Sequence, residues 1–116
     1  MRYVDMFVAA VPAANKDAYT EHAKFMAAVF KDHGASEVVD AWQDDVPEGE
    51  TTSFALAVKR EEGEMIATGY VVWPDKASRE KGMQAMMQDE RMKESGAMPF
   101  DGKRLIYGGF EMIVEL

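Results

Sequence analysis

The residues that decide the fold run from Glu64 to Trp73, EMIATGYVVW, and form the clearest strand in the chain. This stretch is rich in β-branched and aromatic residues, which favour a pleated sheet. Pro74 ends it, because proline has no backbone N–H to donate to a neighbouring strand. Asp75 is then suited to cap a helix, which the sequence predicts from Lys76 to about Asp89. We therefore expect a strand followed by a helix.

This predicted helix has an apolar side made of methionines, Met83, Met86 and Met87. Gly82 lies inside the helix, where glycine costs about 1 kcal/mol relative to alanine. A close approach of another part of the chain would explain its presence. A short extra turn is predicted around Glu90 to Glu94.

The same order occurs earlier in the chain. Tyr3 to Val11 is predicted to be a strand that ends at Pro12, and its two largely apolar faces are typical of a strand in the middle of a sheet. Asn15 is a plausible N-cap for a helix from Lys16 to about His33, with Gly34 as its stop. One apolar stripe predicts that this helix lies on the sheet, and it consists of Tyr19, Ala23, Met26, Val29 and Phe30.

Two further strands complete the predicted sheet. They are Ser36 to Val46 and Arg104 to Glu115, and Gly108-Gly109 in the last one indicates a β-bulge or a tight backbone contact. Thr51 to Gly63 is a connection that could hold a short strand or a helical turn. The order β-α-β-β-α-β predicts an α+β, ferredoxin-like fold, with an antiparallel sheet and two helices on one face.

A single domain and a dimer are expected from this arrangement. The 116 residues are too few for two ordinary cores, so we expect one domain over residues 1–116. Helices on one face leave the other sheet face bare. A large exposed apolar patch is unusual on a monomer, so the sequence predicts a homodimer that joins through this open face.

Composition excludes several classes of function. The chain has no cysteine, which excludes disulfides, thiolate-bound zinc and cysteine nucleophiles and is compatible with the cytoplasm. The net charge of −8 argues against a nucleic-acid partner, which requires clustered Lys and Arg. No segment approaches the roughly 20 apolar residues of a membrane span. We therefore expect a cytoplasmic protein with no nucleic-acid partner and no membrane partner.

Three polar residues are candidates for catalysis or binding: Asp5, His22 and Arg104. Asp5 lies in mid-strand, where a carboxylate is buried or faces a cavity and needs a partner. Arg104 opens the last strand and could pair with Asp5 or with Asp40 of the second strand. His22 lies at the edge of the helical stripe, where it could face a pocket or simply be packed. A buried ion pair that fixes the strand register is the structural alternative to catalysis.

Four aromatic residues are candidates for lining a ligand pocket: Trp42, Tyr70, Trp73 and Tyr107. They combine apolar surface with polar tips, as a pocket for a flat organic ligand requires, although core or interface packing explains them equally well. The two histidines would lie roughly 16 Å apart on one helix, too far to share a metal. We therefore expect no metal site and no cofactor.

Several motifs carry a family resemblance. They are Tyr3-Val4-Asp5 with Phe7, Val11-Pro12, Thr52-Ser53-Phe54 with Ala57-Val58-Lys59, Val72-Trp73-Pro74, and Met98 to Arg104 (MPFDGKR) followed by Tyr107 to Phe110 (YGGF). In these motifs the chain resembles the uncharacterised YbaA-like family, domain of unknown function 1428. The resemblance implies the dimeric α/β-barrel version of the ferredoxin-like fold. It implies no reaction, because the family has no established activity.

Three functions are compatible with these observations. The first is a small-molecule binding protein or cofactor-independent enzyme with a pocket between sheet and helices, since the wider dimeric α/β-barrel group includes both enzymes and binding scaffolds. The second is a non-catalytic homodimeric module. RNA binding, to which the names of some relatives point, is least favoured because of the net charge. The MPFDGKR loop could clamp an anionic ligand or lock the end of the barrel, and locking is favoured.

Overall fold

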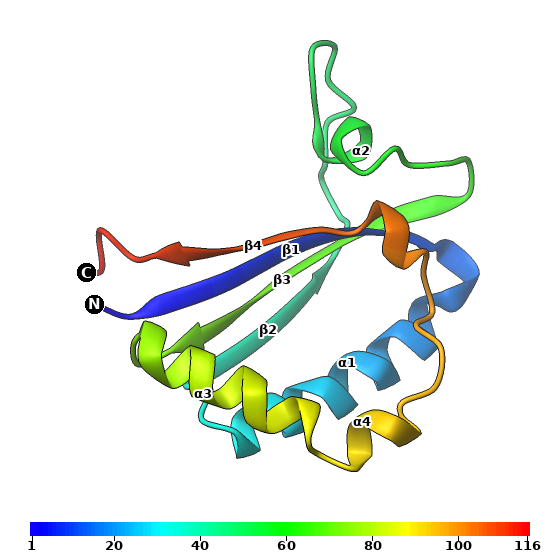
Figure 1. Ribbon diagram of the computed structural model, residues 1–116. Coiled ribbons are helices and arrows are strands. Elements are labelled where there is room, and N and C mark those ends of the chain that lie inside the picture. The colour runs from blue at the N-terminus through cyan, green and yellow to red at the C-terminus, as the bar shows by residue number, and fades with distance from the viewer.

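The four strands of the protein form one antiparallel sheet. The computed structural model describes residues 1–116 (Figure 1). Its strands are β1 (Tyr3–Pro12), β2 (Glu37–Trp42), β3 (Glu64–Trp73) and β4 (Ile106–Glu111). They are arranged in the order β2-β3-β1-β4, so the two longest strands are central. The predicted α+β class is confirmed.

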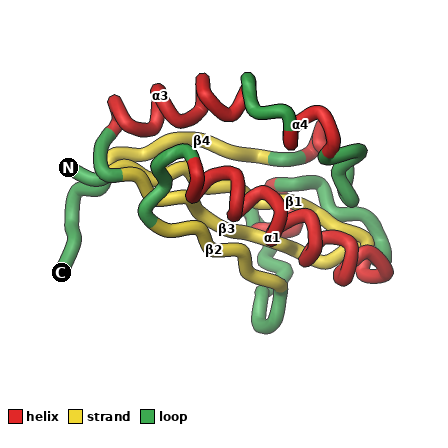
Figure 2. Tube along the Cα trace, turned by 90° about the horizontal axis from the view of Figure 1, so that it is seen from below, coloured by secondary structure: helices red, strands yellow, loops and turns green.

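Both long helices lie on one face of the sheet, as Figure 2 shows from below. They are α1 (Lys16–Asp32) and α3 (Lys76–Met87). None of the helices has the length and apolar character needed to cross a membrane. Four short segments complete the helical structure: η1 (Ala13–Asn15), α2 (Phe54–Ala57), α4 (Arg91–Glu94) and η2 (Gly102–Arg104).

The ends of the long helices follow the expected local chemistry with one exception. Asp75 accepts a hydrogen bond of 2.7 Å from the backbone N–H of Ser78, which caps α3 as predicted. Gly34 follows α1 with a φ of 106°, a conformation that glycine adopts without strain. Asn15 occupies the N-cap position of α1 but does not cap it. Its side-chain amide donates instead to the carbonyl of Pro99 at 3.0 Å.

Two glycines allow close approaches, as the sequence predicted. A Cβ at Gly82 would collide with the ring of Trp73 and with the carbonyl of His33. A Cβ at Gly109 would collide with the ring of Tyr3. The alternative of a β-bulge at Gly108-Gly109 is wrong, because β4 pairs with β1 in one continuous register.

Several details differ from the sequence prediction. The second strand ends at Trp42 rather than Val46, because Gln43 turns its side chain back to accept a bond of 2.8 Å from the N–H of Ile66. The last strand runs from Ile106 to Glu111 rather than from Arg104 to Glu115, and the η2 turn precedes it. Met87 is 79% exposed and does not belong to the apolar side of α3.

Residues 43–63 form an arm that leaves the sheet after β2 and returns at β3. The arm stands on the face opposite α1 and α3 (Figure 1). Of the two alternatives for this connection, the helical turn is present: α2 is one turn, and Ser53 caps it by accepting a 3.0 Å bond from Leu56 N–H. Val58 of the arm packs with Ala10 and Ile66 and so covers one end of this face.

The core on the helical face is divided into two clusters. Ala9, Val11, Tyr19 and Ala67 form the first, and Ala35, Val71 and Trp73 form the second. The clusters lie toward opposite ends of the central strands β1 and β3. Phe7 and its partner Gly69 lie between the two clusters, and Asp5 lies beside Val71 of the second cluster.

Candidate functional site

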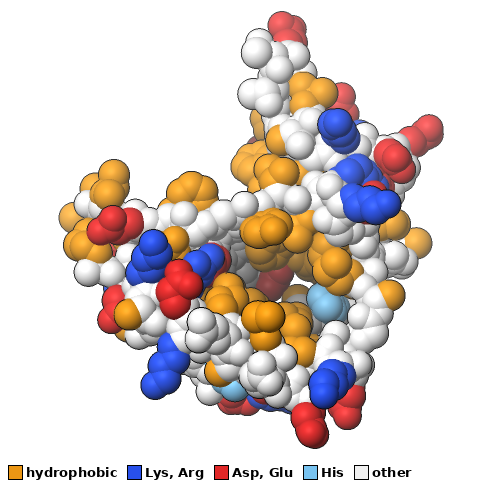
Figure 3. All heavy atoms as spheres, viewed as in Figure 1, with side chains coloured by type: hydrophobic (Ala, Val, Ile, Leu, Met, Phe, Trp, Pro, Cys, Tyr) orange, Lys and Arg blue, Asp and Glu red, His pale blue; other side chains and the backbone are white.

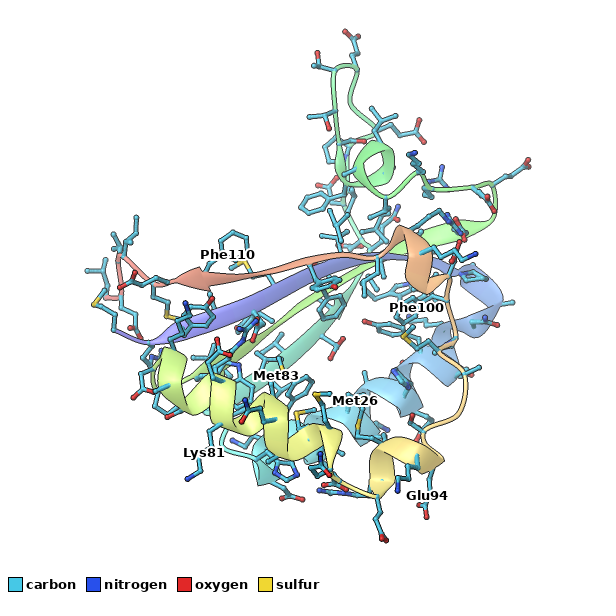
Figure 4. All side chains as sticks on the ribbon, in the orientation of Figure 1. Met26, Lys81, Met83, Glu94, Phe100 and Phe110 are labelled. Atoms are coloured by element: carbon cyan, nitrogen blue, oxygen red, sulfur yellow. The ribbon has the colours of Figure 1, made fainter.

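A cavity of about 300 Å³ lies between the sheet and the two long helices. Nineteen residues line it and fourteen of them are hydrophobic, so an occupant would be held mainly by apolar contacts. Figure 3 shows it as a hollow ringed by hydrophobic side chains, with acidic side chains visible inside. Met26, Met83 and Phe100 lie around the hollow in Figure 4, whereas Phe110 stands on the other side of the sheet.

The space over the middle of the sheet is open because β3 has a glycine there, which has no side chain to fill it. Gly69 pairs with Phe7 of β1, and a Cβ at Gly69 would lie only 2.8 Å from the Phe7 ring. The ring therefore lies over the glycine, close to the sheet. Space remains above it for another molecule.

Asp5 is held by an ion pair at one side of the cavity. Arg79 donates from Nη2 to Oδ1 at 2.8 Å and from Nε to Oδ2 at 3.2 Å. Trp73 Nε1 donates to the same Oδ2 at 3.0 Å. The hydrogen bond to Asp5 raises the pKa of Arg79, and the guanidinium also lies 5.3 Å from the centre of the Tyr3 ring. The charge of Asp5 is thus neutralised inside the protein.

Asp40 lies on β2 and has a different environment. The Tyr19 hydroxyl donates to its Oδ1 at 2.7 Å, and Oδ2 has no hydrogen-bond partner within the chain. Burial, followed by this bond, raises the pKa of Tyr19, so the hydroxyl remains a donor at neutral pH. Asp40 therefore presents a carboxylate oxygen with no cationic partner.

His22 lines the cavity from α1, and neither of its ring nitrogens has a hydrogen-bond partner within the chain. Its ring stands edge-on to Phe100, with centroids 6.5 Å apart. Burial lowers the pKa of His22, and the negative charge of Asp40 opposes this only in part. At neutral pH the ring is uncharged and offers one donor and one acceptor to an occupant.

The four aromatic candidates do not all face the cavity. Tyr107 lines it from β4. Tyr70 pairs with Met6, so its side chain lies on the sheet face opposite that of Asp5, and its hydroxyl lies 3.4 Å from Glu37 Oε1. Tyr70 is nevertheless among the residues that border the cavity, so its role as a pocket aromatic stays a prediction.

The two tryptophans lie at the margins of the site. Trp73 is fully buried and packs edge-on against Phe30, with ring centroids 6.1 Å apart. Trp73 contacts the site only through its indole N–H, which donates a hydrogen bond to Asp5. Trp42 lines an adjoining groove of about 270 Å³ between α1 and β2, and its ring centroid is 5.8 Å from that of Tyr19.

Arg104 lies outside the cavity. Its Nη1 and Nη2 donate to the two carboxylate oxygens of Glu64 at 2.7 and 2.8 Å, and its Nε donates to Asp101 at 3.0 Å. The expectation that Arg104 pairs with Asp5 or Asp40 is therefore wrong. Glu64 begins β3 and is almost fully buried, so this bidentate pair fixes the MPFDGKR loop to the sheet.

Arg79 and Phe100 are two of the lining residues that were not predicted as part of a site from the sequence. Arg79 precedes Met83 by one helical turn and lies on the same face of α3. Since Met83 was predicted to lie on the apolar side of this helix, its spacing from Arg79 could have indicated that Arg79 faces the site. Phe100 lies in the MPFDGKR loop, 5.9 Å from the Tyr19 ring by centroid distance. Its place depends on the Arg104–Glu64 anchor, which no local pattern reveals. No group of three or more His, Asp or Glu side chains is placed to hold a metal ion.

Comparison with known proteins gave consistent matches. The profile of the family described as "Protein of unknown function (DUF1428)" matches residues 2–102. The chain is 53% identical over 116 residues to the "Uncharacterized protein YbaA" of Escherichia coli strain K12, with 99% of each chain covered, and shows the same figures for Shigella flexneri. Among solved structures, SnoaB, a cofactor-independent oxygenase from Streptomyces nogalater, is similar with a TM-score of 0.56 and 12% identity, over 99% of this chain and 96% of that one. This last similarity concerns the fold alone.

Proposed function

The chain belongs to the DUF1428 family of proteins of unknown function, and from its geometry we propose that it binds a small, mainly apolar organic molecule in the cavity. The observation that carries this proposal is an apolar cavity that His22 lines with a ring whose two nitrogens form no hydrogen bond within the chain. Pockets of this kind, apolar with a few polar groups, are the usual form of small-molecule sites. At about 300 Å³ the cavity is at the small end of their range, which favours an occupant of one or two fused rings.

Proton transfer by His22 is a second candidate, because this ring is neutral and is not engaged by the protein. A base of this kind could take a proton from a bound molecule. The structurally similar SnoaB is a cofactor-independent oxygenase, which supports the use of this fold for catalysis without a cofactor. The transfer of that activity to this chain is part of the proposal.

We further propose that the protein forms the dimeric α/β-barrel version of the ferredoxin-like fold. The strand order β2-β3-β1-β4 with two helices on one face supports it. Apolar side chains on the opposite face support the dimer: Phe110 is 53% exposed, Met6 is 48% exposed, and Ile106 lies beside them. A second copy laid on this face would remove these side chains from water.

Titration with 6-propionyl-2-dimethylaminonaphthalene, an uncharged dye with two fused rings that fluoresces more strongly in apolar surroundings, tests the binding proposal. Ala23 lines the cavity and Ala18 of the same helix is exposed. We expect the native chain and Ala18→Phe to bind the dye, and Ala23→Phe to bind it at least about tenfold more weakly, because the added ring occupies the cavity. Equal binding by the two variants would show that the dye binds elsewhere and would overturn the proposal.

A further inference from the structure

The charges around the cavity do not balance. Two carboxylates line it, Asp5 and Asp40, and the only guanidinium is that of Arg79. Arg79 is committed to Asp5 by two hydrogen bonds. His22 is neutral at pH 7 and supplies no positive charge. The cavity therefore carries one uncompensated negative charge, located on Asp40.

No lysine compensates Asp40 from the adjoining groove. Lys24 lines that groove, but its Nζ lies 3.3 Å from Glu21 on the surface of α1. Lys16 lies with its Nζ 5.7 Å from the centre of the Trp42 ring and forms no ion pair with Asp40. The partner of Asp40 within the chain is a neutral hydroxyl, that of Tyr19. This arrangement orients the carboxylate and leaves its charge available.

The surroundings of Asp40 suit a positively charged nitrogen. The rings of Tyr19, Trp42 and Phe100 form a cluster next to the carboxylate, with centroids 5.8 and 5.9 Å from that of Tyr19. Aromatic faces attract cations, and a carboxylate beside them adds a charge-assisted hydrogen bond. Lys16 already uses one face of Trp42 in this manner. Tyr19 and Phe100 remain available to an occupant of the cavity.

Asp40 is also accessible from solvent. It lies where the cavity meets the groove between α1 and β2, and it lines both. A charged nitrogen at this position would keep part of its hydration while the apolar body of the molecule entered the cavity. The net charge of −8 would favour the approach of a cation over that of an anion.

We propose that the cavity recognises a protonated amine carried on an apolar or aromatic body, with the ammonium group bound by Asp40 and the rings of Tyr19 and Phe100. This inference rests on the proposed function, since it specifies the ligand class of the same cavity. It excludes aliphatic and aromatic carboxylates as preferred ligands, because they would face Asp40 without a cation between them.

Three probes with the same apolar body separate the two proposals: 2-naphthylmethylamine, 2-naphthylmethanol and 2-naphthoic acid, titrated into the full chain by isothermal calorimetry at pH 7. We expect the amine to bind at least about tenfold more tightly than the alcohol, and the acid more weakly than either. If the alcohol or the acid binds as tightly as the amine, the amine proposal is overturned while cavity binding stands. If none of the three binds, the cavity proposal fails with it.

Asp40→Asn supplies the decisive variant, because an amide oxygen can still accept the Tyr19 hydrogen bond. We expect Asp40→Asn to have the same stability as the native chain and the same affinity for 2-naphthylmethanol. It should lose the preference for the amine over the alcohol. Asp44→Asn, an exposed change outside the cavity, should keep it. An amine preference that survives in Asp40→Asn would contradict the assignment.

Tyr19→Phe leaves the carboxylate of Asp40 in place and should retain at least part of the preference for the amine. Complete loss of this preference in Tyr19→Phe would also count against Asp40 as the recognition group.

Discussion

Arg79 of α3 and Asp5 of β1, far apart in the sequence, form a two-point ion pair at the side of the cavity, with N–O distances of 2.8 and 3.2 Å. The pair joins the second long helix to a central strand. Trp73 completes it by donating to the same carboxylate. Its strength therefore determines how firmly one wall of the cavity is held.

Replacing Arg79 by methionine should destabilise the protein. The variant leaves Asp5 with only the Trp73 N–H as a partner, in a place that is mostly shielded from water. We expect a loss of about 2 kcal/mol in the free energy of unfolding, below the value for a fully buried pair because some solvent reaches it. Urea denaturation measures this, with Lys81→Met as the control, since Lys81 lies exposed on the same helix (Figure 4). Equal stability of the two variants would show that the pair contributes nothing.

Lowering the pH should destabilise the protein through His22. Burial lowers the pKa of His22 below its ordinary value of about 6.5, so the unfolded chain takes up this proton at a higher pH than the folded chain does. The contribution to stability is complete above about pH 7 and is lost as the pH falls through 6.5 toward the folded-state pKa. One proton contributes at most about 1.4 kcal/mol per pH unit, and the half-buried His22 contributes less. Urea unfolding between about pH 5 and pH 8 should show a stability that falls more steeply on acidification for the native chain than for His22→Asn. Parallel curves would contradict the account.

The elements of the fold could be predicted from local patterns because each carries its own signal. The β-branched and aromatic residues and the stop at Pro74 mark β3, and Asp75 marks the start of α3. Boundaries set by distant partners could not be predicted in this way. Trp42 ends its strand because Gln43 bonds to Ile66, twenty-three positions later.

The candidate site was predicted less completely, since most of its contacts join residues remote in sequence. His22 and Asp5 line the cavity, but the partner of Asp5 comes from α3 rather than from the residue that opens the last strand. The assignment of both Tyr70 and Trp73 to one pocket conflicts with strand geometry, because residues three apart in a strand point to opposite faces. The alternation of side chains along a strand places the rings of Tyr70 and Trp73 on opposite faces of the sheet.

Arg104→Met should detach the MPFDGKR loop and destabilise the fold. The variant leaves the carboxylate of Glu64 almost fully buried without its bidentate partner. Since the hydrogen bond from Arg104 lowers the pKa of Glu64, this pair stabilises the fold above the ordinary pKa of glutamate, and the contribution is lost as the pH falls through the folded-state pKa. Thermal unfolding at pH 7 should show a lower midpoint for Arg104→Met than for the exposed neighbour control Lys103→Met. A smaller difference is expected in strong acid. Identical midpoints at pH 7 would argue against this anchor.

Phe110→Glu should weaken the proposed dimer. Phe110 stands on the sheet face opposite the helices, and a carboxylate there would be buried against a second copy (Figure 4). Light scattering on the native chain should give twice the mass of one chain, and the variant should give a mass nearer to one chain at the same concentration. Met87→Glu places the same charge at a more exposed site on α3 and should leave the mass unchanged. A native mass equal to one chain would refute the dimer.

Mapping where a neutral ligand binds tests the cavity proposal most directly. Uniformly ¹⁵N-labelled protein would be titrated with 2-naphthylmethanol, and the backbone amide shifts recorded at each addition. The cavity predicts saturable shifts at Ala23, Val71 and Leu105, which line it from α1, β3 and the residue just before β4. Shifts confined to Phe110 and its neighbours on the open face, or no saturable shifts at all, would contradict it.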